Sequence, residues 1–355
     1  LTAANNLLGQ MAAAISGAVN KQQSLGLDLG SPSGAGAPVF AVGSPRALAS
    51  SNNTGTAAIS VTVADSSSLQ ASDYSLAFDG ANYTLVRNSD GAAASGSPYS
   101  PAALAAGVQV DGMTIRLTGG TAATNDRFLL QPVATAAQSM QTVLSNPNGL
   151  AAASPFTGTV GVNNTGTASI ASLRAVSPTY DGTLSTSITF TSGTGNYAWT
   201  MSDGSSGMGT WTAGTPISLN GYELQLAGVP KNGDTVSVTP TASVLSNNGN
   251  ALAFSQLGSA GIVASGAGGK NMSITDAYAS ALADIGTRVQ GGKTAATLSS
   301  GIASQAETAR SNQSGVNLDE EAAKLIQYQQ SYQAAAKILQ VAQSVFDTLL
   351  QATAG

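Results

Sequence analysis

Few side chains in this chain of 355 residues could carry out acid-base, nucleophilic or metal chemistry. Histidine and cysteine are both absent, so Ser-His-Asp and Cys-His pairs cannot form. A zinc site would need carboxylates alone, which zinc disfavours. The acidic residues are scattered, except for Asp319, Glu320 and Glu321. We therefore predict no enzyme, with no catalytic residue, no cofactor-binding residue and no metal site.

The three consecutive carboxylates are better explained as the beginning of a helix. Asn317 can cap the helix in a box with Glu320, the negative charges favour the positive end of the helix dipole, and Glu320 can pair with Lys324. Two further patterns have ordinary explanations. Gly286 and Gly292 before Lys293 are spaced one residue too widely for a P-loop. Tyr197, Trp199 and Trp211 could form a ligand-binding aromatic patch, although alternating aromatic residues are more often core.

Charge and hydropathy exclude two classes of partner. Asp, Glu, Lys and Arg make up 9% of the residues, against about 25% in ordinary soluble proteins, and the net charge is −5. This balance argues against a nucleic acid or an anionic membrane surface as partner. No run of 18 apolar residues occurs, so we predict no membrane insertion.

The segment 316–355 is predicted to form a terminal amphipathic coiled-coil helix. Steps of four and three residues place apolar side chains on one seam, and a second row widens it. Such a width exceeds what one partner helix would cover, while glutamines occupy many of the polar positions. We predict that the helix is an assembly interface, and the residues expected to carry it are Leu318, Leu325, Tyr328, Tyr332, Leu339, Phe346, Leu349 and Leu350.

Residues 51–150 and 151–245 are predicted to be two tandem antiparallel β domains, the second a repeat of the first. Apolar residues alternate with period two, and Asp79-Gly80 and Asp111-Gly112 provide hairpin turns. The motif Asn-Asn-Thr-Gly-Thr-Ala occurs at residues 52–57 and again at 163–168. Further on, Asp126 corresponds to Asp234. A short helix is expected between the repeats, over residues 134–144.

The chain ends are predicted to be helical and to surround the β domains. Residues 1–50 form the first part of an inner helical domain, as a helix to about residue 24 followed by an extended connector. Its apolar face is expected to contain Leu8, Met11 and Ile15, together with Ala18, Val19 and Gln22. Residues 246–315 form the second part, which Gly291-Gly292 would kink or divide. Its expected face contains Tyr278, Leu282, Ile285 and Val289. The predicted fold class is α+β multidomain, with helical rod-like segments from both chain ends and the two β domains inserted between them.

The segment from Ser314 to Leu350 (SGVNLDEEAAKLIQYQQSYQAAAKILQVAQSVFDTLL) closely resembles the C-terminal end of the flagellar hook-associated protein 1 family, the hook-filament junction proteins. Val19–Leu29, Ser246–Leu257 and Ser273–Asp284 fit the same family in the same order, as does Ser72–Asp90 in the first β domain. Because the family's N-terminal helix is absent before Leu1, the sequence is expected to be a fragment lacking the N-terminal part.

This resemblance implies a non-enzymatic protein of the bacterial flagellum that is secreted by type III export and lies outside the cell. The implied partners are the hook protein, the neighbouring junction protein, copies of the chain itself in a helical or ring layer, and an export chaperone on the terminal helix. The β domains are implied to face solvent. Two alternatives stay open, namely a flagellin-like filament subunit and an adhesin or glycan-binding module carried by the β domains.

Overall fold

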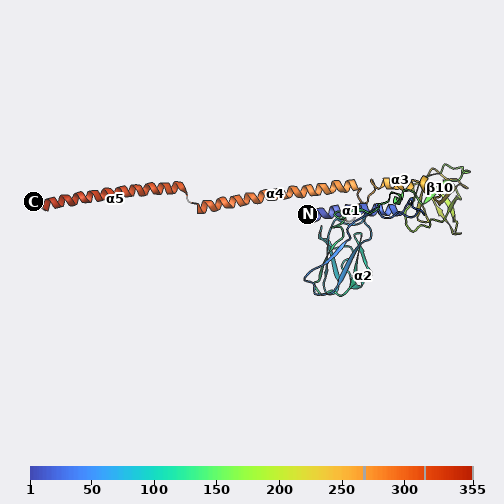
Figure 1. Cartoon of the computed structure of the whole chain (residues 1–355), viewed down its shortest axis with the longest axis horizontal. Helices are drawn as coiled ribbons and strands as arrows, with labels where there is room; N and C mark the ends of the chain where they lie inside the picture. Colours follow the sequence, from blue (N-terminus) through green and yellow to red (C-terminus); the bar gives the residue numbers. More distant parts are fainter. Residues whose placement is uncertain (267–268, 316, 354–355) are drawn as a thin grey trace. The chain divides into compact units, whose positions relative to one another are not determined.

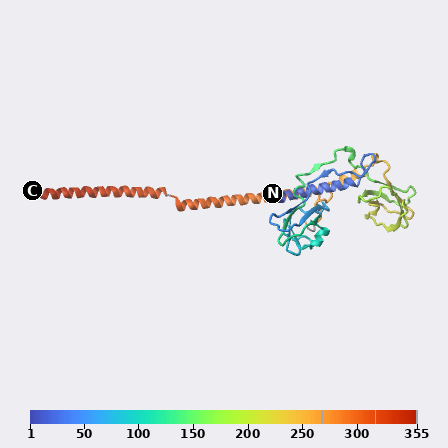
Figure 2. The ribbon, with the colours of Figure 1, turned by 60° about the horizontal axis from the view of Figure 1, so that its bottom comes forward.

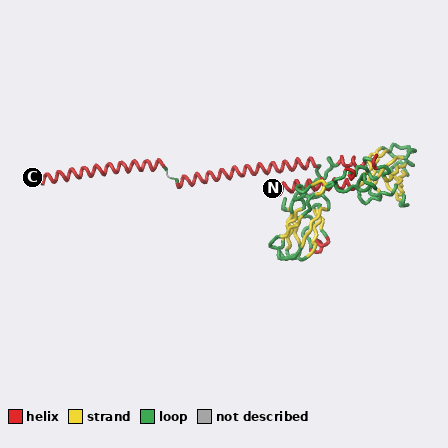
Figure 3. Tube along the Cα trace, in the orientation of Figure 1, coloured by secondary structure: helices red, strands yellow, loops and turns green. Residues whose placement is uncertain are grey.

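The computed structural model of the chain describes residues 1–266, 269–315 and 317–353 (Figure 1). Contacts divide the chain into two compact units, Leu1–Ile285 and Gly286–Gly355. Strands occur in the first unit, where most of them form two groups and a further two form a separate pair, while the second unit is helical (Figure 3). The α+β fold expected from the sequence, with a helix near each chain end and sheets between, is therefore confirmed.

The first group of strands, here called the first β domain, consists of two sheets packed around one core. One sheet has the order β2-β8-β4-β5 and the other β3-β7-β6, with all pairs antiparallel. Tyr74, Leu76 and Phe78 alternate into the core, as the period of two predicted. The elements are β2 (Arg46–Ala49), β3 (Ala58–Val63), β4 (Tyr74–Phe78), β5 (Tyr83–Arg87), α2 (Pro101–Ala106), β6 (Val108–Val110), β7 (Met113–Gly119) and β8 (Arg127–Gln131).

The second β domain repeats this arrangement with one additional strand. Its sheets have the orders β10-β17-β12-β13-β14 and β11-β16-β15. Leaving out β14, the strand orders of the two domains correspond one to one. The strands are β10 (Phe156–Val160), β11 (Ser169–Ala175), β12 (Thr186–Phe190), β13 (Asn196–Met201), β14 (Ser206–Thr210), β15 (Ile217–Leu219), β16 (Tyr222–Ala227) and β17 (Thr235–Pro240).

A buried carboxylate closes the same loop in both β domains. Asp126 Oδ1 and Oδ2 accept hydrogen bonds from the amides of Thr54 (3.0 Å), Gly55 (3.1 Å) and Ala123 (2.8 Å). In the second domain Asp234 accepts the equivalent bonds from Thr165 (2.7 Å), Gly166 (3.0 Å) and Lys231 (2.8 Å). A bond network repeated atom by atom supports the internal repeat inferred from sequence.

The first and last strands of each β domain lie side by side. Arg46 at the start of β2 is opposite Gln131 at the end of β8, and Phe156 at the start of β10 is opposite Pro240 at the end of β17. Each domain therefore begins and ends at one place, next to the helical part of the unit.

Helix α1 (Thr2–Ser24) joins these parts, and of its expected apolar face only Met11 is buried. Leu8 is 42% exposed, whereas small and amide side chains are buried, among them Gly9, Gln10 and Ala13. An ideal Cβ on Gly9 would lie 1.9 Å from the carbonyl oxygen of Val133. The helix therefore packs by close backbone approach, which the spacing of large apolar residues does not reveal.

Buried amides of α1 form hydrogen bonds to segments far away in sequence. The Gln10 side chain donates to the carbonyls of Leu69 (2.6 Å) and Ala264 (3.0 Å). Asn6 donates to Asp73 (3.1 Å), and Gln23 donates to the carbonyl of Gly149 (2.6 Å). These bonds connect α1, the blue ribbon of Figure 2, to the first β domain, to the bridge between the β domains and to the chain that follows the second.

The bridge between the β domains was predicted wrongly as a helix over residues 134–144. Residues 134–139 form turns, with Ala136 buried in the core of the first β domain. Residues Gln141–Thr142 then form β9, which pairs with β1 (Phe40–Ala41) from the connector after α1. Tertiary pairing has overridden the local helical preference. A short 3₁₀ helix, η1 (Pro147–Gly149), follows.

The C-terminal helices also depart from two expectations. After η2 (Val244–Ser246) and α3 (Gly249–Gln256), α4 (Ile274–Ser314) continues through Gly291-Gly292 without a break. At its beginning Ala277 and Ala281 pack against Met11 and Ala14, so Tyr278, Leu282 and Val289 of the expected face stay exposed. Small residues again form the contact. The last helix, α5, spans Leu318–Thr353.

We expect Gly9→Ala to destabilise the first unit by about 1–3 kcal/mol, because the added methyl group collides with backbone rather than with a movable side chain. Thermal unfolding followed by calorimetry measures the change. The matched control is Gly292→Ala, where an added Cβ meets no atom within 4 Å. There the better helix propensity of alanine should leave stability equal or higher by about 1 kcal/mol. Equal losses at both positions would contradict the close-packing explanation.

We expect Asp234→Asn to lower the stability of the second β domain in a pH-dependent manner. The backbone amide of Lys231, followed by those of Thr165 and Gly166, holds the pKa of Asp234 below its ordinary value. Its contribution is therefore complete above the unfolded-state pKa of about 3.9 and is lost as pH falls through the lower folded-state pKa. The difference between wild type and variant should shrink below about pH 4.

Tryptophan fluorescence during denaturant unfolding measures the stability of the second β domain alone. The two tryptophans of the chain, Trp199 and Trp211, both lie in that domain. The control is Asp203→Asn, an exposed carboxylate that bonds to Ser205 within its own turn. Its effect should be smaller. A difference for Asp234→Asn that stays constant from neutral to strongly acidic pH argues against the clamp.

Candidate assembly interface

The predicted assembly residues all lie on α5 and are all exposed. Their relative exposures run from 52% for Leu350 to 80% for Leu318. Within the described part of α5, no residue is buried. The structure thus displays the complete stripe on one continuous helix. We call this set, from Leu318 to Leu350, the assembly stripe. Its role as an interface stays a prediction.

Two exposed apolar residues escaped the sequence analysis. Ile326 and Val341 are 55% and 58% exposed and lie outside both predicted rows. At 100° per residue they extend the apolar surface of α5 well past the seam. A helix that is apolar on most of its sides is usually buried among several neighbours. They could have been found by measuring how much of the helix circumference apolar residues occupy, instead of by counting heptad positions.

The beginning of α5 supports the structural explanation of its acidic cluster. The Asn317 side chain accepts a hydrogen bond from the amide of Asp319 (3.2 Å), and the Asn317 carbonyl accepts one from the amide of Glu321. Lys324 lies 3.5 Å from Glu320 and 3.3 Å from Glu321. Among the residues that the structure describes, no group of acidic side chains could hold a metal ion.

Charge is concentrated in the first two turns of α5. Beyond Lys324, the charged residues up to Thr353 are Lys337 and Asp347. Glutamine occupies much of the remaining polar surface, for example Gln330 and Gln333. Copies of such a helix can pack together with little repulsion between like charges.

The other sequence patterns belong to ordinary structure. Gly286, Gly292 and Lys293 lie inside α4 and form no loop. Trp211 is buried, and Trp199 and Tyr197 pack against the core of the second β domain. Trp199 and Tyr197 cover Gly207 and Gly209 of β14, where added Cβ atoms would lie 2.7 Å and 2.5 Å from their rings. This packing accounts for the aromatic residues without a ligand.

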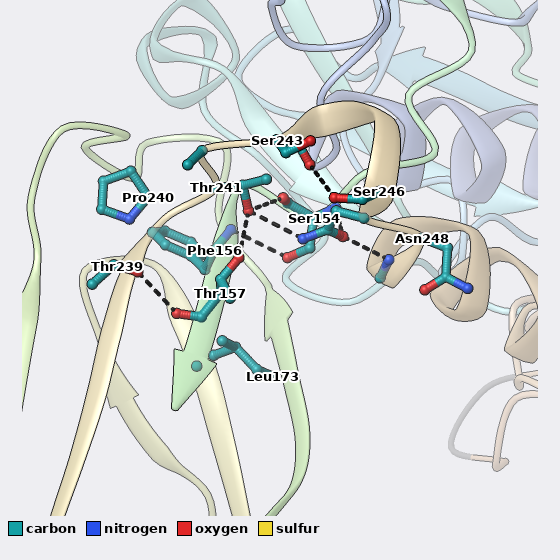
Figure 4. A pocket seen from close by; sticks show the side chains of 14 residues that line it. Ser154, Phe156, Thr157, Leu173, Thr239, Pro240, Thr241, Ser243, Ser246 and Asn248 are labelled. Atoms are coloured by element: carbon teal, nitrogen blue, oxygen red, sulfur yellow. Dashed lines mark hydrogen bonds between the residues drawn. The ribbon is translucent and has the colours of Figure 1, made fainter. Parts of the chain in front are cut away.

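A polar hollow of about 520 Å³ lies where the second β domain meets η2 and α3 (Figure 4). Its hydroxyl and amide groups are bonded to one another. Thr241 Oγ1 donates to the carbonyl of Ser154 (2.8 Å) and accepts from the Asn247 side chain (3.1 Å), while Asn247 Oδ1 accepts from the amide of Ser154 (2.9 Å). The hollow is therefore a hydrogen-bonded joint rather than a ready ligand site.

In the described residues no helix combines the length and the apolar run that crossing a membrane requires. Helix α5 displays the most apolar surface, and glutamines interrupt its apolar residues throughout.

Two family models match parts of the chain. Residues 48–132 match "Flagellar hook-associated protein 1, D2-like domain", which covers the first β domain. Residues 308–352 match "Flagellar basal body rod FlgEFG protein C-terminal", which covers most of α5.

Curated relatives match almost the whole chain. The flagellar hook-associated protein 1 of Salmonella typhimurium is 28% identical over 347 residues, which is 97% of this chain and 46% of the relative. The Escherichia coli K12 protein of the same name is 28% identical over 346 residues with the same coverages. The chain thus spans less than half the length of these relatives.

A solved structure shares the fold. The flagellar hook junction protein FlgK from Burkholderia pseudomallei superimposes with a TM-score of 0.70 at 26% identity, covering 88% of this chain and 60% of that one. Named as hook-associated or junction proteins, these homologues are structural flagellar components. The repeated β domains, the long C-terminal helix and these matches together show that the chain is similar to the flagellar hook-associated protein 1 family.

Proposed function

We propose that this chain is a structural, non-enzymatic component of the bacterial flagellum that joins the hook to the filament. The observation that carries the proposal is the exposed assembly stripe on α5, on a helix whose last turns are almost without charge. Exposed apolar surface of this extent is typical of an interaction site. The names of the homologues supply the flagellar setting.

The energetics favour several neighbours over a single one. Burying one Leu-sized or Phe-sized side chain contributes about 1.5–3 kcal/mol, so the stripe can contribute on the order of 10 kcal/mol. Association itself costs roughly 4–15 kcal/mol in lost freedom. One helix-helix contact along part of the stripe would therefore be marginal. Enclosure by several helices in a helical or ring layer would be stable.

The partners we propose follow from this requirement. Copies of the chain supply helices of matching, nearly neutral surface, and the hook protein and the neighbouring junction protein border the layer on its two sides. Before assembly the same stripe would promote aggregation, so an export chaperone is proposed to cover α5. The β domains, whose apolar residues are already buried in their own cores, would face solvent.

Secretion through the flagellar type III channel is part of the proposal, and it places the protein outside the cell. A narrow channel requires an unfolded chain, and disulfides would oppose unfolding. This sequence contains no cysteine, so no such bridge can form. The homologues' names as hook-associated proteins favour a short junction layer over a long filament-forming subunit.

We expect Leu339→Asp and Phe346→Asp, introduced into the chromosomal gene, to abolish incorporation into flagella and motility. A carboxylate within the stripe cannot be buried between helices without a partner. Tryptophan fluorescence of the purified chain should be unchanged, because both tryptophans lie in the second β domain. Immunoblots of sheared flagella and swimming assays measure the outcome.

Val162→Asp is the matched control, since it adds the same charge at a position of the second β domain that is 98% exposed. This control variant should incorporate at near wild-type level. Detection of a variant protein in the culture medium shows that its export still occurs. Normal flagella carrying Leu339→Asp would refute the role of the stripe. Equal loss with Val162→Asp would show that the defect comes from the added charge itself and not from the stripe.

A further inference from the structure

The strand β14 leaves one edge of the second β domain open. It is the last strand of its five-stranded sheet and pairs with β13 alone. The residues of β14 are Ser206, Gly207, Met208, Gly209 and Thr210, and none of them is charged or a proline. Met208 is 88% exposed. Natural edge strands usually carry charges, prolines or bulges that prevent pairing with another chain, and β14 has none of these.

The backbone register shows which groups point outward from β14. The amide of Trp211 donates to the carbonyl of Gly195, and that of Met201 donates to Ser205, so these are hydrogen-bonded pairs of the ladder. Because such pairs alternate, Gly207 and Gly209 bond to β13. The amides and carbonyls of Ser206, Met208 and Thr210 therefore face away from the sheet. Within the described residues these three are joined to no further strand.

The corresponding outermost segment of the first β domain is interrupted by a proline. In the first β domain the segment 92–99 lies along β5, with Tyr83 and Tyr99 exchanging two hydrogen bonds of 2.8 Å, and Pro98 interrupts it. The two copies of the repeat thus treat the same edge differently.

The sequence of β14 fits a second copy of itself. It reads almost the same in both directions about Met208, with a glycine on each side and a hydroxyl residue beyond each glycine. We propose that β14 pairs antiparallel with β14 of a second copy of this chain, about a two-fold axis through Met208. Ser206 then lies opposite Thr210, and the outward groups form about six hydrogen bonds.

This pairing joins two five-stranded sheets into one continuous sheet. The absence of side chains at Gly207 and Gly209 leaves the inner face free of steric conflict, and Met208 meets its counterpart on the outer face. Few residues take part, so the contact falls in the small, weak class of interfaces. It is separate from the stripe on α5 and does not depend on the function proposed above, because a two-fold contact relates copies free in solution and not the head-to-tail neighbours of one helical or ring layer.

Cysteine crosslinking tests the register directly, because the chain has no cysteine of its own. In the proposed pair the two Cα atoms of residue 208 lie about 5.5 Å apart, within reach of a disulfide. In the Ser206→Cys variant the two Cα atoms of residue 206 lie roughly 14 Å apart, because they are displaced by four residues along the strands. Oxidised Met208→Cys should therefore form covalent dimers at least about tenfold faster than Ser206→Cys.

Val162→Cys, at a site 98% exposed between β10 and β11, controls for random collision. Repeating the set with Leu339→Asp in each chain removes association through α5, and the preference for position 208 should persist. Unchanged tryptophan fluorescence confirms that each variant is folded. Equal rates at the three positions, no dimer from Met208→Cys, or loss of the preference in the Leu339→Asp background would each overturn the proposal.

Discussion

Hydrogen bonds from the buried amides of α1 hold the first unit together. Gln10 bonds to the chain ahead of β4 and to the chain that returns after α3, while Gln23 bonds to the bridge between the β domains. Buried amides of this kind are costly when unpaired, so each one fixes the position of its partner segment. Since Gly9 and the alanines of α1 allow close approach, the amides can reach backbone carbonyls directly. Both β domains are positioned by this polar helix.

Apolar residues are distributed in two ways along the chain. In the β domains they alternate with polar residues and are buried in two separate cores. On α5 they lie exposed, from Leu318 to Leu350. Folding of the β domains is thus independent of assembly, whereas burial of the α5 surface requires other chains in the proposed layer. This division explains how one sequence can combine folded β domains with a helix that is incomplete by itself.

The sequence allowed the β repeat, the hairpin turns and the C-terminal helix to be predicted, because a period of two and a heptad are both local signals. It misled for α1, where Leu8 looked like core and Gly9 proved to be the contact. The bridge over residues 134–144 looked helical, but β1 and β9 pair there across about a hundred residues, which no local pattern reveals. For the candidate interface, the stripe could be read from spacing, whereas Ile326 and Val341 lay outside any heptad.

The adjacency of β2 with β8 and of β10 with β17 has a consequence for how such chains diversify. The ends of each β domain are one strand spacing apart, about 5 Å. A domain attached in this manner can be enlarged, exchanged or removed while the helices that hold it keep their path. The β domains can therefore change during evolution at a rate different from that of the helical part to which they are attached.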